Sequence, residues 1–207
     1  MQKRTRWDHD LIFDLIPAGS SVLDLGCGNG ELLARLVEEK QVRGQAVEAD
    51  PDQVMAAIHN GVAVYQGDLD RGLAEFNSKS FDYVVVEKTL QALRRPLFVL
   101  EEILRVGEVC IVSFPNFSYH EVVKMLVETG RMPVSASLPY QWHDTPNIHL
   151  FTLLDFLDWV EKQEVTVVSG YAWGAFGYRN LVLPEDITGA EELLFVMRQT
   201  PEHDARS

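Results

Sequence analysis

Cysteine is scarce in this sequence, with only Cys27 and Cys110 among 207 residues. Two cysteines are too few for the disulfide framework of a small secreted protein, and neither belongs to a C-x-x-C pair. The six histidines show no zinc-ligand spacing with them, so we predict no metal site. Cys27 lies in a glycine turn that demands a small residue, and no activating base is near it in the sequence. This favours a small filler over a nucleophile.

Long apolar runs and an excess of basic residues are also absent. No segment approaches the roughly 20 apolar residues of a membrane span, and the N-terminal MQKRTRWDHD lacks the features of a signal peptide. Lysine and arginine number 18 against 31 acidic residues, and the net charge of −13 argues against a nucleic-acid substrate. We therefore expect a cytoplasmic protein with no membrane or nucleic-acid partner, folded as a single α/β domain over residues 1–207.

A glycine turn between a strand and a helix is the most informative feature that is present. In VLDLGCGNG, residues 22–30, Asp24 lies near the strand end, glycines follow at positions 26, 28 and 30, and an amphipathic run comes next. Such a turn lets a ligand lie against bare backbone at a helix N-terminus. The dinucleotide fingerprint needs its third glycine where Glu31 stands, and a negative side chain there suits a pyrophosphate poorly. The spacing instead resembles motif I of class I S-adenosylmethionine (SAM) methyltransferases.

Further landmarks follow in the order that such a site requires. A strand over 42–49 ends near Glu48, about 20 residues past the glycines, where an acid can hold ribose hydroxyls. After a strand over 62–66, the turn at Asp68 and Leu69 would hold adenine by resemblance, and Glu87 ends the apolar strand 81–86 beside the methionine moiety. The alternative is that these are ordinary packing turns of an α/β fold. The predicted cofactor residues are Asp24, Gly26, Cys27, Gly28, Gly30, Glu48, Asp68, Leu69 and Glu87.

Strands and helices alternate through most of the chain. A helix over 7–16 should pack against the sheet edge or cover the cofactor mouth, and strand–helix alternation then runs from 22 to 114. Asp50 before Pro51, and Thr152 with Asp155 three residues on, are N-cap signals for two helices. A helix over 152–163 and strands over 165–169 and 192–198 close the fold. We predict a doubly wound, mostly parallel seven-stranded α/β sheet with helices on both faces, an antiparallel last strand by resemblance to class I methyltransferases, and a disordered tail at 200–207.

An insertion over 115–150 interrupts the alternation after the fifth strand. It contains a helix over 119–129 and then an irregular segment, 131–150, whose length indicates function and whose aromatic content argues against disorder. We predict that this segment is a partner or substrate surface or lid, because Arg131, Tyr140 and Trp142 are of the types enriched at binding hot spots. The alternative for Trp142 is a place in the core. Phe114-Pro115-Asn116-Phe117 lacks the N-P-P-[YF] pattern and is interpreted as a structural turn.

Other polar candidates are ambiguous. His143 could be a general base or a surface residue, and His149 could make a structural hydrogen bond or take part in catalysis. Lys88 and Gln91 follow the fourth strand, where substrate contacts are common, but a solvated helix start is equally consistent. No catalytic residue is assigned. The predicted substrate or partner residues are Lys88, Gln91, Arg131, Tyr140, Trp142, His143 and His149.

Four segments resemble the methionine biosynthesis protein MetW family: VVVEKTLQALRRP (84–96), IVSFPNF (111–117), GRMPVS (130–135) and LPYQWHDTPNIHLFT (138–152). The resemblance covers roughly residues 7–200. It implies a class I SAM-type fold, SAM or S-adenosylhomocysteine as cofactor, and a homoserine O-acyltransferase as partner.

Three hypotheses remain open. The chain could be a SAM-binding partner protein in methionine biosynthesis, with SAM acting as an end-product signal. It could be a SAM-dependent methyltransferase acting on a small molecule, with the insertion as a lid. It could be a nucleotide-binding module that has lost SAM, although Glu48 and Asp68 count against this. The resemblance favours the first.

Overall fold

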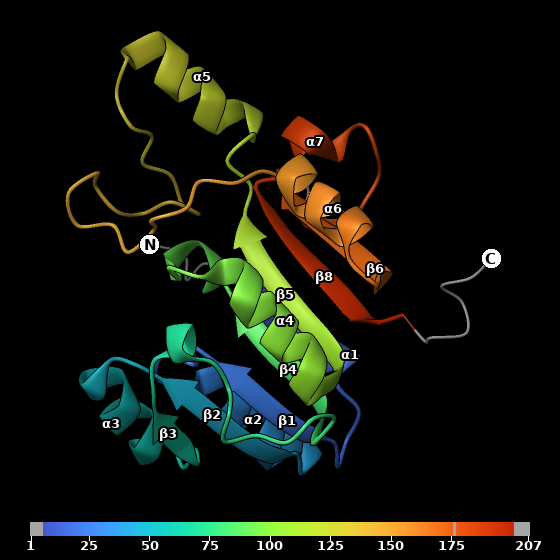
Figure 1. Ribbon diagram of the computed structural model, residues 1–207. Helices are drawn as coiled ribbons and strands as arrows, with labels where there is room; N and C mark the ends of the chain where they lie inside the picture. The colour runs from blue at the N-terminus through green and yellow to red at the C-terminus, as the bar shows by residue number, and fades with distance from the viewer. Residues whose placement is uncertain (1–5, 176, 201–207) are drawn as a thin grey trace.

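The computed structural model describes residues 6–175 and 177–200. Eight strands form one sheet in the order β3-β2-β1-β4-β5-β8-β6-β7 (Figure 1). The strands are β1 Ser21–Leu25, β2 Arg43–Glu48, β3 Val64–Gln66, β4 Phe81–Glu87, β5 Gly107–Pro115, β6 Val165–Gly174, β7 Gly177–Asn180 and β8 Glu192–Gln199. The α-helices are α1 Trp7–Leu15, α2 Glu31–Lys40, α3 Pro51–His59, α4 Pro96–Val106, α5 His120–Thr129, α6 Leu153–Lys162 and α7 Asp186–Gly189, and the 3₁₀-helices are η1 Leu69–Arg71 and η2 Leu90–Ala92.

The strand directions confirm most of the predicted sheet. Strands β3, β2, β1, β4 and β5 pair in parallel, and β8 pairs antiparallel with both β5 and β6, as expected for the last strand. The predicted number of strands was wrong, because β7 adds an eighth strand that pairs antiparallel with β6. Its sequence, GYRN, is short and largely exposed. It has no apolar alternation because it is an edge strand with little to bury, so periodicity could not reveal it.

Both faces of the sheet are covered, and the apolar run in β4 shows why. Val84 and Val86 belong to the core beneath α4 and α6, whereas Val85 belongs to the core beneath α1 and α2. Successive side chains of a strand point to opposite faces, so a strand buried on both faces must be continuously apolar. In Figure 1, α4 and α6 lie in front of the sheet and α1 and α2 lie behind it.

Two helix starts carry the caps that their sequences predict. The Asp50 side chain accepts a hydrogen bond from the backbone N–H of Asp52 at 2.8 Å, and Pro51 occupies the first position of α3. At the start of α6, Thr152 and Asp155 form a reciprocal capping box. Such caps satisfy backbone donors that a helix leaves free at its N-terminus, so short local sequences fix where α3 and α6 begin.

The insertion follows β5 and extends beyond the end of the sheet (Figure 1). It consists of α5 and a long irregular segment that returns to α6. Among the described helices, none is long and apolar enough to cross a membrane. The predicted disordered tail falls mostly on residues 201–207, which lie outside the described residues, whereas the backbone N–H of Thr200 donates to the Glu164 carbonyl.

Candidate functional site

The glycine turn sits at the carboxyl end of β1, with all three of its glycines in the left-handed region. The φ angles are +75° at Gly26, +55° at Gly28 and +73° at Gly30. A Cβ at Gly26 would lie 2.5 Å from Thr89 Oγ1, so no side chain fits there. Gly30 packs instead against Val62 and is the N-cap of α2. The turn therefore holds bare backbone next to the start of a helix, as its sequence predicts.

A cavity of about 350 Å³ opens at this turn. We call it the glycine-loop cavity. Six predicted residues line it: Asp24, Gly26, Cys27, Gly28, Glu87 and Lys88. Five lining residues were not predicted: Arg6, His9, Asn29, Leu32 and Gln53. Its place outside the carboxyl ends of neighbouring parallel strands is the usual binding position in open α/β sheets.

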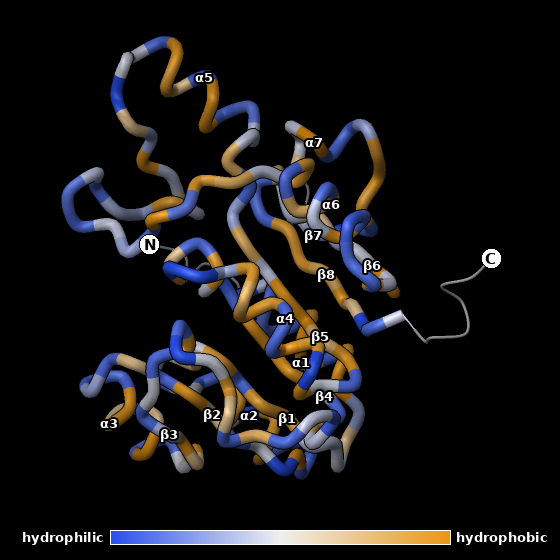
Figure 2. Tube along the Cα trace, viewed as in Figure 1, coloured by the Kyte–Doolittle hydropathy of each residue, from blue (hydrophilic) through white to orange (hydrophobic). Residues whose placement is uncertain are grey.

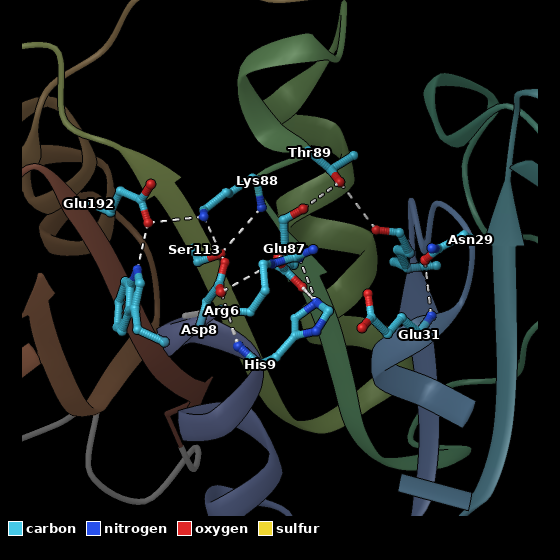
Figure 3. Close-up of polar contacts among 12 residues, drawn as sticks. Arg6, Asp8, His9, Asn29, Glu31, Glu87, Lys88, Thr89, Ser113 and Glu192 are labelled. Atoms are coloured by element: carbon cyan, nitrogen blue, oxygen red, sulfur yellow. Dashed lines mark hydrogen bonds and ion pairs between the residues drawn. The ribbon is translucent and has the colours of Figure 1, made fainter. Parts of the chain in front are cut away.

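The N-terminal segment and α1 reach the cavity through Glu87, at the end of β4. Arg6 Nη2 donates to Glu87 Oε1, and His9 Nε2 lies 2.8 Å from Glu87 Oε2 (Figure 3). Arg6 and His9 also contact each other, at 2.6 Å. The first helix therefore lies beside the glycine-loop cavity, and covering a cofactor there stays a prediction. Only the spacing of Arg6 and His9 along one turn of the helix could have hinted at their shared target.

Lys88, next along the chain, also lines the cavity, but its ammonium group belongs to an ion-pair network with two buried carboxylates. Its Nζ lies 2.7 Å from Asp8 Oδ2 and 2.9 Å from Glu192 Oε2, and Trp7 Nε1 donates to the same Glu192 oxygen at 2.6 Å (Figure 3). Burial would lower the pKa of Lys88, but the Glu192 and Asp8 carboxylates outweigh burial and raise it. Lys88 therefore ties α1 to β4 and β8, and a substrate contact by Lys88 stays a prediction.

Asp8 belongs to the same network and is fully buried. Burial would raise the pKa of its carboxyl, but a hydrogen bond with Glu87 and the charges of Lys88 and Arg6 hold the pKa well below its usual value. The charge on Asp8 is thus stabilised by the fold, and it helps to anchor α1 beside the cavity.

Asp24 lies on β1, beneath the glycine turn, with only 3% of its surface exposed. Burial, together with the negative charges of Glu87 and Glu48, raises the pKa of its carboxyl from 3.8 to about 8. The same surroundings raise the pKa of the Cys27 thiol to about 12, so Cys27 is no thiolate nucleophile at neutral pH. A positively charged ligand group would relieve this crowding of carboxylates.

Glu48 ends β2, as predicted, but its carboxylate is turned onto backbone amides. Oε2 accepts from Gly28 N–H at 2.9 Å, and Oε1 accepts from the N–H groups of Ala49 and Asp50 at 2.8 and 2.9 Å. Glu48 thus braces the glycine turn against the β2–α3 connection. A carboxylate has lone pairs to spare, so these bonds are compatible with further hydrogen bonds to ribose hydroxyls.

Asp68 and Leu69 lie apart from the glycine-loop cavity. Asp68 caps η1 by accepting from the Asp70 N–H at 3.0 Å, and its side chain is 54% exposed beside a separate cavity of about 190 Å³. Leu69 is buried in the core. Both have ordinary structural functions in this arrangement, and an adenine contact at this turn stays a prediction.

Gln91 is buried and is not part of a solvated helix start. Its side-chain Nε2 donates to the backbone carbonyl of Lys88 at 2.5 Å. The backbone carbonyl of Gln91 accepts from the N–H groups of Ile148 and His149 at 2.9 and 3.0 Å. Gln91 therefore joins the segment after β4 to the returning limb of the insertion.

The polar candidates of the insertion do not converge on one site. Tyr140 and Trp142 line an apolar groove of about 260 Å³, and His149 lines a different cavity, of about 180 Å³, near α4 and α6. Arg131 and His143 line neither and are exposed. Trp142 is 76% exposed, so the alternative that it belongs to the core is wrong.

The turn after β5 is structural, as its sequence indicates. Asn116 is buried, and its Nδ2 donates to the carbonyls of Ile187 and Ala190. Its Oδ1 accepts from Ser118 and from the Leu153 N–H, so one side chain fixes both ends of the insertion. Across residues 6–175 and 177–200, no three His, Cys, Asp or Glu side chains gather as metal ligands would.

Comparisons with known proteins agree with this arrangement. The family model "Methionine biosynthesis protein MetW" matches residues 6–182. The bifunctional methionine biosynthesis protein MetXA/MetW of Rhodopirellula baltica is 38% identical over 175 residues, which cover 80% of this chain and 28% of that protein. The chain thus spans less than a third of the length of this relative.

Solved structures show the fold. A SAM-dependent methyltransferase from Thermotoga maritima aligns with a TM-score of 0.67 at 14% identity, covering 96% of this chain and 90% of that one. A TehB-like SAM-dependent methyltransferase from Corynebacterium glutamicum aligns at 0.62 and 18% identity, with coverage of 96% and 90%. The [4+2]-cyclase SpnF aligns at 0.67 and 16% identity, with coverage of 93% and 80%. The fold is thus of the methyltransferase type, and it does not by itself fix a reaction.

Proposed function

The chain belongs to the MetW family of methionine biosynthesis proteins, and from this membership we propose that it binds SAM or S-adenosylhomocysteine in the glycine-loop cavity and supports a homoserine O-acyltransferase by direct association. A cytoplasmic location and a single domain over residues 1–207 stay predictions.

The charges around the cavity support the choice of cofactor. SAM carries an ammonium and a sulfonium group, and Asp24 and Glu87 are carboxylates that line the cavity. The raised pKa of Asp24 is what a buried carboxyl shows when a positive partner is lacking. Asp24 and Glu87 would hold the methionine end, the bare backbone of Gly26 and Gly28 would allow close approach, and Glu48 would hold the ribose. When bound, SAM would supply an activated methyl group or serve as a signal.

Association with an acyltransferase is supported by one observation above all. The Rhodopirellula relative is named as a bifunctional MetXA/MetW protein, and this chain matches only 28% of its length. Joining two activities in one chain keeps them at high effective concentration, which is an advantage where the separate proteins must act together. We propose the same association between this chain and an acyltransferase that is a separate chain. SAM lies downstream of methionine, so its occupancy of the cavity could report end product to that partner.

Two measurements test the proposal. Calorimetry should show binding of SAM and S-adenosylhomocysteine but not of NAD⁺, whose pyrophosphate suits Glu31 poorly. Affinity purification from the native cell should recover a homoserine O-acyltransferase with the chain. Absence of SAM binding would refute the cofactor, and a repeated failure to recover the acyltransferase at native expression levels would refute the partner.

Methyl transfer to a small molecule is the second candidate, and the methyltransferase neighbours favour it. Such a reaction needs a nucleophile and often a proton acceptor near the methyl group. His9 is the imidazole in the lining of the glycine-loop cavity, and it is engaged by Glu87. Release of S-adenosylhomocysteine upon addition of a candidate acceptor would support this alternative.

A further inference from the structure

Helix α5 presents an apolar face that the rest of the described chain does not cover. Val123, Leu126 and Val127 are spaced by three and four residues, so they lie on one face, and their side chains are 43, 44 and 78% exposed. Val122 is the buried residue of the helix. A surface helix normally turns such a stripe toward a core. In Figure 2 the apolar positions of α5 stand out on a helix that is far from the sheet.

An apolar groove begins just after this helix. Its volume is about 260 Å³, and Met132 and Pro133, directly after the end of α5, contribute to its lining. Trp142, Ile148 and Leu150 also line it and are 76, 55 and 56% exposed. We call the face of α5 together with this groove the insertion surface. Exposed apolar area of this kind marks interaction sites on soluble proteins.

Hydrogen bonds anchor both ends of the insertion to the rest of the fold. The Asn116 side chain ties the start of α5 and the start of α6 to the α7 region through five hydrogen bonds. The Gln91 carbonyl holds the returning limb through Ile148 and His149. A pre-organised surface loses less entropy on binding than a mobile loop does.

Charged residues are sparse in the insertion. Of its 36 residues, 115–150, five are charged, namely Glu121, Lys124, Glu128, Arg131 and Asp144, whereas charged residues make up 24% of the whole chain. Interface cores are depleted in charged residues and enriched in aromatic residues and methionine. The insertion surface therefore fits an apolar protein surface rather than a charged ligand.

We propose that the insertion surface is where the homoserine O-acyltransferase docks, with its apolar side chains covering the face of α5 and filling the groove. This inference rests on the proposed function. The MetXA/MetW relative joins MetXA and MetW in one chain, which favours an acyltransferase as the occupant, and the family match over residues 6–182 runs through the whole insertion.

The test uses the full chain and the separately purified acyltransferase. Val127→Glu places a charge at the most exposed position of the α5 face, where folding does not depend on the side chain. Met55→Glu is the matched control, because Met55 is 54% exposed on α3, at the opposite end of the sheet. We expect Val127→Glu to weaken the complex by about tenfold or more and Met55→Glu to leave its affinity unchanged. Thermal unfolding and SAM binding should be the same for both variants and the wild type.

The possible outcomes test the docking surface and the proposed function independently. If the wild type does not bind the acyltransferase, the proposed function fails. If the wild type binds and Val127→Glu binds equally tightly, the function stands and the docking surface is wrong. If sedimentation shows that the chain dimerises and Val127→Glu abolishes only the dimer, the surface binds a second copy, and the proposal is overturned.

Discussion

Asp24 is a carboxyl group whose ionisation is unfavourable in the folded protein. Its carboxyl lies among Glu48 and Glu87, and its pKa rises from 3.8 to about 8 with no described cation or hydrogen bond offsetting the effect. Between these two values the folded chain keeps a proton that the unfolded chain loses. Asp24 therefore lowers stability progressively as pH rises from about 4 to 8.

The first prediction concerns the stability of Asp24→Asn. The amide removes the ionisable group, so the variant should be more stable than the wild type by about 1–3 kcal/mol at pH 8.5, with a smaller difference at pH 5. Urea unfolding at both pH values measures this. The prediction fails if the difference between variant and wild type is independent of pH.

Ligand binding should be linked to the same proton. A cationic ligand group requires the ionised form of Asp24, so SAM binding at pH 7 should release up to about one proton. Calorimetry in two buffers of different ionisation enthalpy counts the released protons. Asp24→Asn should bind SAM more weakly and release fewer protons, whereas equal release from both proteins would place the ligand elsewhere.

Glu48 braces the glycine turn, and substitution tests whether it also holds the ribose as proposed. Glu48→Ala should weaken SAM binding by about 1–3 kcal/mol, the scale of a lost charge-assisted hydrogen bond. The variant also loses three backbone contacts, so its thermal midpoint serves as the folding control. Equal SAM affinity in calorimetry for Glu48→Ala and the wild type would rule out a ribose contact.

At the scale of elements, the sequence predicted those features that depend on interactions between residues close together in the chain. The glycine turn, the caps of α3 and α6 and the doubly buried β4 all follow from neighbouring residues. The edge strand β7 did not, because pairing to β6 fixes it rather than its own pattern. Arg6 and His9 were missed for the same reason, since their partner Glu87 lies about 80 residues further along the chain.

The attachment of α1 gives an element-scale prediction. Lys88→Met would remove the cation that the buried carboxylates of Asp8 and Glu192 share, so the protein should lose roughly 3–5 kcal/mol of stability. Lys124→Met is the control, because the Lys124–Glu121 pair is exposed and worth roughly 0–0.5 kcal/mol. Urea unfolding compares the two variants, and equal losses would contradict a structural role for Lys88.

Trp142, in the segment 131–150, gives a second element-scale prediction. Because its side chain is 76% exposed, Trp142→Ala should shift the unfolding free energy by only about 0.5 kcal/mol and leave SAM binding intact. Its affinity for the acyltransferase should fall. A variant that melts early would show that Trp142 supports the fold, and one that still binds the partner would direct attention to α1.

At the scale of the whole molecule, the glycine-loop cavity and the insertion both lie beyond the carboxyl ends of the parallel strands and share one short connection. Glu87 and Lys88 line the cavity, and the Gln91 carbonyl, a few residues later, holds Ile148 and His149 of the insertion. A change at the end of β4 upon ligand binding thus has a contiguous chain of hydrogen bonds to the insertion surface.

This connection leads to the last prediction, which is that SAM changes the affinity of the chain for the acyltransferase. Coupling between two sites is reciprocal, so the acyltransferase must change the affinity for SAM by the same factor, on the order of 5-fold or more. Calorimetric titrations of each ligand with and without the other measure both factors. Asp24→Asn should bind SAM more weakly, so at SAM concentrations that saturate only the wild type its acyltransferase affinity should change less. If SAM leaves the acyltransferase affinity of the wild type unchanged, the two sites are independent, and SAM is a substrate or a structural ligand rather than an end-product signal.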